Sequence, residues 1–251
     1  MEARDTNGFE KRAYQCKGNL SSRDDIAAHA LLSAPSLFLS LPRLALLAAG
    51  LLTLAVVWLG PLPELARGAF SAHMAMHMSV VAVAAPLLTL AVAGGRFDPV
   101  RRTPVLFAPI PASLIEFIIV WTWHAPALHH MARHSAAGLI VEQGSFLLAG
   151  LLVWLSALGG DASNRSDRTA AGVMGLLLTS MHMTLLGALL ALTPRPLYIH
   201  TGAFSGLTPL EDQHLGGAIM LLVGGVSYLT GGLWLTAKLI RGVDLKSKGE
   251  A

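Results

Sequence analysis

Residues 70–95 read FSAHMAMHMSVVAVAAPLLTLAVAGG, a run without Asp, Glu, Lys or Arg that is long enough to cross a bilayer. Its first turns hold His73 and His77, four residues apart, so on a helix both imidazoles project from one face. Met74 and Met78 form a second pair with the same spacing. Imidazole and thioether groups together suit Cu(I). The stretch therefore predicts a transmembrane helix with a soft-metal site at its mouth.

The composition of the chain is that of a membrane protein. Of its 251 residues, 53% are hydrophobic and 13% are charged, and the mean hydropathy is +0.58. Soluble domains average about 25% charged residues, so roughly half the usual charge is missing. Apolar runs of around 20 residues recur, which predicts an all-α, polytopic transmembrane helical bundle. The net charge of +3 does not indicate a nucleic-acid partner, because the basic residues lie in loops and tails.

The apolar runs predict about six spans, and a helix before residue 41 would make seven. Residues 1–40 are expected to form a polar cytoplasmic tail with room for one interfacial helix. Residues 41–240 form the predicted transmembrane helical domain, and residues 241–251 a cytoplasmic C-terminal tail. The predicted spans are 41–60, 70–95, 104–124, 137–158, 170–193 and 215–239.

The distribution of Lys and Arg predicts the orientation. If both termini are cytoplasmic, fifteen of the 18 basic residues lie on the inner side. Only Arg67, Arg133 and Arg195 then lie on the outer side. This bias is the one that the positive-inside rule describes.

Polar residues gather in the outer half of the predicted membrane domain. His124 ends the third span, Glu142 lies in the first turns of the fourth, and His214 precedes the sixth. His182 and Glu116 lie deeper, near the middle of their spans. A charged group at a helix centre costs about 2.5–3.5 kcal/mol even on insertion scales. Mutual coordination would offset that cost, so we interpret the gathering as a metal site.

The predicted metal ligands are four histidines and two methionines: His73, His77, His182, His214, Met74 and Met78. The His73–His77 pair is the core, with His182 or His214 and one methionine completing the shell. Three residues are predicted to orient the imidazoles or to balance charge: Glu142, Asp212 and His124. Taken singly, the methionines are ordinary packing residues of an apolar helix. A loop or surface role is favoured for three histidines that lie together in an outer loop: His129, His130 and His134.

The sequence offers little support for an enzyme. It contains no phosphate-binding G-x-x-x-x-G-K-[ST] loop, no H-E-x-x-H zinc motif and no G-x-S-x-G nucleophile elbow. Cys16 is the single cysteine, which excludes an internal disulfide or a CxxC copper site. We therefore predict a protein without catalytic residues.

Four motifs in order along the chain resemble the multi-spanning CtaG family of cytochrome c oxidase assembly proteins. They are FSAHMAMHM at 70–78, WHAPAL at 123–128, GALLALTPRPLY at 187–198 and LEDQHLGGAIM at 210–220. The resemblance covers roughly residues 45–240. Gln143 is a departure, because the family commonly has histidine after the glutamate at this place. The positions that match the family's motifs are His73, His77, Trp123, His124, Pro126, Glu142, Tyr198, Asp212, Gln213 and Gly216.

The resemblance implies a non-enzymatic factor in a bacterial inner (plasma) membrane that assembles cytochrome c oxidase. Its partners would be oxidase subunits, periplasmic copper chaperones and the lipid bilayer. Oxidase copper is loaded from the outer face, so we expect Cu(I) at the periplasmic side. Three alternatives stay open: a haem-binding membrane protein, a scaffold for an oxidase subunit that binds no metal, and a copper or proton-coupled transporter.

Overall fold

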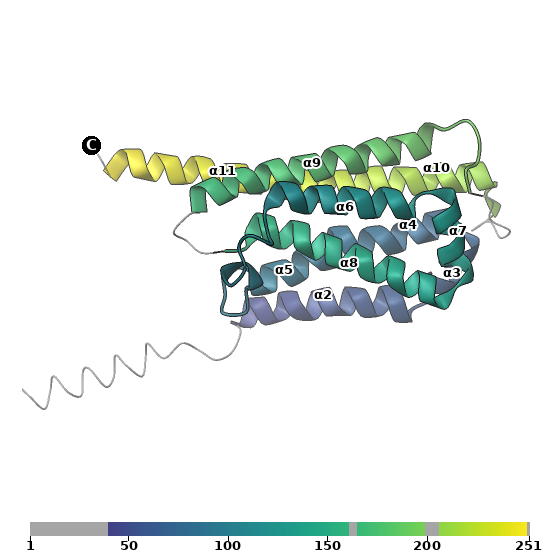
Figure 1. Cartoon of the computed structure of the whole chain (residues 1–251), viewed down its shortest axis with the longest axis horizontal. Helices are drawn as coiled ribbons and strands as arrows, with labels where there is room; N and C mark the ends of the chain where they lie inside the picture. The colour runs from purple at the N-terminus through teal and green to yellow at the C-terminus, as the bar shows by residue number, and fades with distance from the viewer. Residues whose placement is uncertain (1–39, 161–164, 199–205, 250–251) are drawn as a thin grey trace, which may run out of the picture. The chain divides into compact units, whose positions relative to one another are not determined.

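The computed structural model describes residues 40–160, 165–198 and 206–249, and within these ranges it is helical with no β-strand. Figure 1 shows the long helices side by side, with the short helices α3 and α7 at one end. The all-α prediction is therefore confirmed. In chain order the elements are α2 (Leu41–Leu59), α3 (Leu62–Gly68), α4 (Phe70–Met78), η1 (Ser79–Ala84), α5 (Ala85–Val92), η2 (Pro99–Arg101), α6 (Pro109–Trp123), α7 (Pro126–His134), α8 (Ala136–Leu158), α9 (Arg165–Leu192), α10 (Pro209–Ile219), η4 (Met220–Gly224) and α11 (Gly225–Gly249).

Five of the described helices are long and apolar enough to cross a membrane. They are Leu41–Leu59, Phe70–Val92, Ala136–Leu158, Asp167–Leu192 and Pro209–Arg241. The apolar helix α6 is shorter, with 15 residues. The count of six spans and the cytoplasmic termini thus stay predictions. Residues 1–39 lie outside the described residues, and α11 continues as a helix through positions 241–249.

The second span contains a π-helical segment, η1, immediately before Pro86. Proline has no N–H to donate, so a carbonyl one turn earlier loses its helical partner. In a bilayer such a carbonyl needs another donor from within the protein. The Ser227 hydroxyl donates to Ala82 O at 2.7 Å, and Trp154 Nε1 donates to Val81 O at 3.0 Å. Side chains of α11 and α8 therefore stabilise the irregular backbone and connect this span to its neighbours.

Glycines bring α9 and α10 into close contact. A Cβ built on Gly217 would lie 2.5 Å from the backbone nitrogen of Ala191 and 2.7 Å from the carbonyl oxygen of Gly187. Small residues of this kind let helices in a membrane approach each other. The contact holds the last turn of α10 beside the end of α9.

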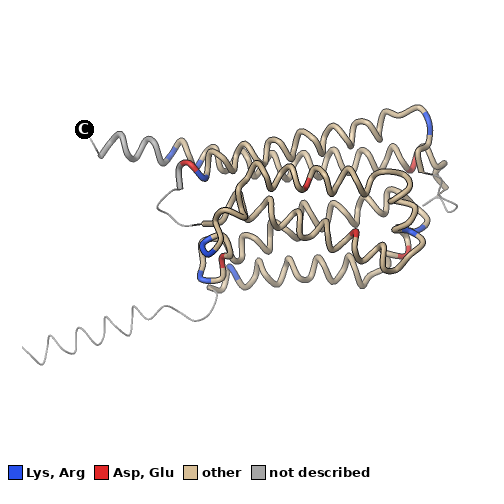
Figure 2. The backbone as a smooth tube through the Cα atoms, viewed as in Figure 1, with Lys and Arg blue, Asp and Glu red and all other residues tan. Residues whose placement is uncertain are grey.

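Charged residues lie mainly at the two ends of the bundle, as Figure 2 shows. One end carries the basic residues at the start of α2 and α9, in the connection from α5 to α6, and near the end of α11. The other carries the three basic residues Arg67, Arg133 and Arg195. The arrangement agrees with the predicted orientation, in which the second end faces outward.

We expect Gly217→Ala to lower the free energy of unfolding by about 1–3 kcal/mol, because its methyl group would meet the backbone of α9. Gly225→Ala is the matched control, since a Cβ there meets nothing within 4 Å. Thermal unfolding of the detergent-purified variants measures both. Equal midpoints for the two variants would contradict the close approach.

Candidate metal centre

The first turn of α4 is anchored by a carboxylate from α10. The backbone N–H of Phe70 donates to Asp212 at 2.6 Å and that of Ser71 at 3.3 Å, and the Ser71 hydroxyl also donates to the same group. A carboxylate at a helix N-terminus satisfies free N–H groups and favours the helix dipole. Asp212 thus positions the helix that carries the histidines. Its observed contacts are with backbone and hydroxyl groups, whereas the sequence analysis expected it to orient imidazoles.

His73 and His77 lie one turn apart on α4 and are both fully buried. Their rings are nearly parallel, with an interplanar angle of 10° and centroids 6.4 Å apart. None of their four ring nitrogens has a hydrogen-bond partner among the described residues. A buried polar group without a partner costs about 1–3 kcal/mol, so such groups call for an explanation. Coordination of a metal ion would explain why both imidazoles are buried without a described hydrogen-bond partner.

His129 joins this pair from α7, the short helix across the end of the bundle (Figure 1). Pro126 begins α7, and its buried face carries His129, Ala132 and Arg133 at the spacing of one helical side. The ring of His129 meets that of His73 edge-on, with centroids 4.7 Å apart. The sequence analysis favoured a loop or surface role for His129. The i, i+3, i+4 spacing was the signal that could have placed it inside.

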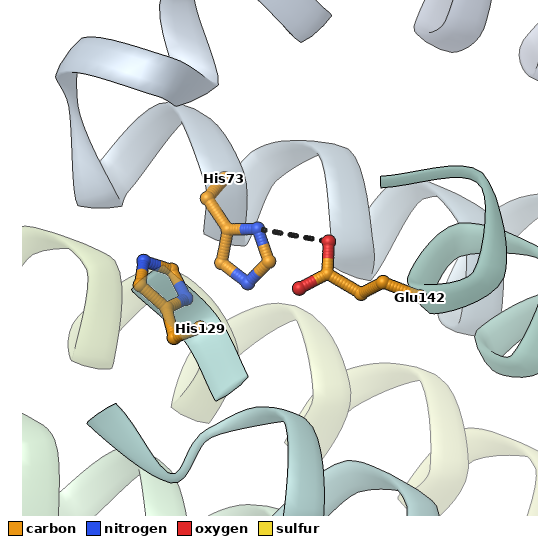
Figure 3. Close-up of side chains that lie close together, drawn as sticks. All are labelled: His73, His129 and Glu142. Atoms are coloured by element: carbon orange, nitrogen blue, oxygen red, sulfur yellow. Dashed lines mark ion pairs between the residues drawn. The ribbon is translucent and has the colours of Figure 1, made fainter. Parts of the chain in front are cut away.

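Glu142 enters from the second turn of α8 and is fully buried. Arg133 donates a hydrogen bond to its Oε2 atom, and Gln143 Nε2 donates to the same atom at 3.3 Å. His73 Nδ1 lies 3.8 Å from Oε2, as Figure 3 shows. The other oxygen, Oε1, has no hydrogen-bond partner among the described residues. Glu142 therefore has one anchored oxygen and one oxygen that can bind a ligand.

Arg133 balances the charge of Glu142. Its guanidinium is buried, and this burial lowers the pKa of Arg133 from its ordinary value, while the neighbouring Glu142 carboxylate raises it. An arginine pKa starts so high that the group stays charged. The ion pair is thus a neutral unit within the apolar bundle.

The ligand atoms of His73, His129 and Glu142 all lie within 4.8 Å of one another. The three side chains come from α4, α7 and α8 and surround a common space (Figure 3). Two imidazoles and a carboxylate form a donor set of borderline hardness, which suits copper, zinc or iron. These residue types therefore fit a transition metal.

His124 adds a fourth imidazole with a defined tautomer. Its Nδ1 lies 2.6 Å from Val120 O, and because a carbonyl can only accept, Nδ1 carries the proton. The lone pair is then on Nε2, which is buried and has no described partner. The ring lies 5.5 Å from His77 and 6.0 Å from His73, centroid to centroid. The Tyr198 hydroxyl donates a hydrogen bond to His124 O at 2.6 Å and so stabilises the backbone at the end of α6.

The structure places the two predicted third ligands elsewhere. His182 lies beside Phe117, with its Nε2 3.9 Å from Oε2 of Glu116. His214 contacts the carbonyl oxygen of Thr193 through its Nε2 at 2.9 Å, which joins α10 to the end of α9. Neither residue belongs to the cluster of described side chains that could hold a metal. The imidazole that lies beside His73 comes from α7 instead and belongs to His129.

Met74 and Met78 lie against glycines of α10 and η4. A Cβ on Gly216 would lie 3.1 Å from Cγ of Met74, and one on Gly224 would lie 3.6 Å from the sulfur of Met78. Both methionines are thus packed against α10 and η4 and almost completely buried. This contact agrees with the packing role that each methionine has when taken singly.

Comparison with known proteins gives one match. A family model described as cytochrome c oxidase caa3 assembly factor (Caa3_CtaG) matches residues 30–242. The comparisons with curated proteins and with solved structures gave no match. All the clustered residues described above lie within the matched range.

The Arg133–Glu142 pair generates a double-mutant prediction. Arg133→Gln leaves a buried carboxylate without its cation and should cost about 3–5 kcal/mol. Adding Glu142→Gln removes the stranded charge, so the double variant should regain part of the loss. The free energy of unfolding in mixed micelles is measured for the two single variants, Arg133→Gln and Glu142→Gln, and for the double variant. Simple additivity would show that the two groups do not interact.

Proposed function

The chain belongs to the family of cytochrome c oxidase caa3 assembly factors, and from this premise we propose that it holds copper for the oxidase under assembly. The observation that carries the proposal is the group of His73, His129 and Glu142, whose ligand atoms lie within 4.8 Å of one another, with the buried imidazoles of His77 and His124 beside His73. Five ring nitrogens, those of His73 and His77 and Nε2 of His124, are buried without a described hydrogen-bond partner. Copper is here the cargo, and the protein's task is to bind and release it.

The surrounding charges favour release as well as binding. Arg133 compensates Glu142, so the site has no excess negative charge to retain a cation. Affinity then depends on neutral imidazoles and on the free oxygen of Glu142. Transient binding of this kind suits a protein that passes a metal on.

The place of the site supports a periplasmic role. The site lies at the bundle end that has few basic residues, which the positive-inside rule assigns to the outer face. We propose a bacterial inner membrane, with oxidase subunits and periplasmic copper chaperones as partners. The function requires no catalytic residue.

A double variant tests the site. We expect His73→Ala/His77→Ala to abolish high-affinity Cu(I) binding by the purified protein, because it removes two clustered imidazoles. The matched control is His130→Ala/His134→Ala, a pair with the same spacing that is exposed on α7. Copper content after competition with a Cu(I) chelator measures both.

Two outcomes would contradict the copper proposal. Unchanged copper stoichiometry in the His73→Ala/His77→Ala variant would remove these residues from the site. A Soret band in the purified protein would favour the haem alternative. Each variant's elution volume on gel filtration controls for misfolding.

Oxidase assembly provides a cellular test. In a strain without its own copy of the gene, the His73→Ala/His77→Ala variant should give little oxidase activity at an unchanged protein level. Added copper should restore part of that activity, because the defect is in metal supply. Full activity without added copper would instead support a scaffold that needs no metal.

A further inference from the structure

A cavity of about 340 Å³ lies at the bundle end opposite the histidine cluster. It is formed where α5 and α8 end, where α2 and α9 begin, and beside the middle of α11. By the distribution of basic residues this end faces the cytoplasm. The cavity shares no lining residue with the candidate metal centre.

Three cations line this cavity: Arg43, Arg168 and Lys238. Arg43 donates through Nη2 to Ala93 O at 3.0 Å. Nε and Nη2 of Arg168 are buried and have no hydrogen-bond partner among the described residues. A buried guanidinium with unused donors is costly, and phosphate oxygens match its fork of N–H groups.

The guanidinium of Arg168 packs against Gly160. A Cβ on Gly160 would be 2.8 Å from Arg168 Nε and 3.2 Å from its Cζ. Gly160 also has φ +101°, a conformation that other residues rarely adopt. The turn after α8 therefore leaves the space that the guanidinium occupies.

An acidic side chain beside the cavity, that of Asp98 next to the lining residue Gly159, already accepts hydrogen bonds from backbone groups. Asp98 accepts hydrogen bonds from the N–H groups of Gly94 at 2.7 Å, Gly160 at 2.8 Å and Val100 at 2.9 Å. No described carboxylate forms an ion pair with any of the three cations of the cavity. Among the described residues, the lining of the cavity therefore carries excess positive charge.

We propose that this cavity binds the phosphate headgroup of an anionic phospholipid. Basic pockets between transmembrane helices on the cytoplasmic side are suited to such headgroups. Leu90 and Trp234 also line the cavity and are 39% and 50% exposed, so apolar surface continues from the cations to the bilayer. Lys238 Nζ lies 5.0 Å from the centroid of the Trp234 ring, which is typical of a side-chain pair at a membrane interface. A free anion would not use this apolar side.

Native mass spectrometry of the full-length protein tests the proposal. The probes are phosphatidylglycerol and phosphatidylcholine with identical acyl chains. We expect preferential retention of phosphatidylglycerol and about tenfold weaker retention by Arg168→Gln, because charged hydrogen bonds to the phosphate are lost. Lys238→Gln is a second variant at a more exposed position. The matched control is Arg241→Gln, which removes a cation one turn further along α11 and outside the cavity.

Three results would overturn the proposal. Equal retention of the two lipids would show no headgroup recognition. Equal losses in the Arg168→Gln and Arg241→Gln variants would show only general attraction between charges. Stabilisation by inorganic phosphate alone, absent in Arg168→Gln and without any lipid preference, would identify a free anion as the ligand.

Discussion

The candidate metal centre depends on the contact between the Asp212 carboxylate and the first turn of α4. Inside a membrane protein, the free N–H groups of a helix end need an acceptor from the protein itself. Asp212 supplies it from α10, and the close packing of α10 on α9 holds the carboxylate in place. The height and direction of α4, and with them the positions of His73 and His77, follow from this one interaction.

The same requirement explains several other contacts of buried polar groups. The carbonyls near Pro86 are satisfied by Ser227 and Trp154, and Glu142 is compensated by Arg133. The imidazoles of α4 are different, because their nitrogens have no such partner among the described residues. Unpartnered imidazole nitrogens next to a carboxylate oxygen without a described hydrogen-bond partner mark a candidate binding site.

The two ends of the bundle have different chemistry. At the predicted outer end the buried Arg133–Glu142 ion pair lies beside a group of buried imidazoles, which suits a transition metal that must be released. At the predicted inner end cations outnumber acids around a cavity, which suits a phosphate group. The mostly apolar middle separates them. It contains a small polar group in which the Tyr228 hydroxyl donates to Glu116 at 2.7 Å and His182 lies beside the same carboxylate. A metal-handling function therefore needs the outer end alone.

Hydrophobicity and spacing within one helix determined two features of this protein from sequence, the helical membrane domain and the shared face of His73 and His77, while the resemblance of four motifs indicated the family. Only the tertiary structure decided which other residues join that pair. His129 enters because α7 crosses the end of the bundle, whereas His182 turns to Glu116 and His214 to a backbone carbonyl. The physical reason is that periodicity defines a side chain's direction relative to its own helix axis, while contacts between helices depend on rotations and crossings that packing sets.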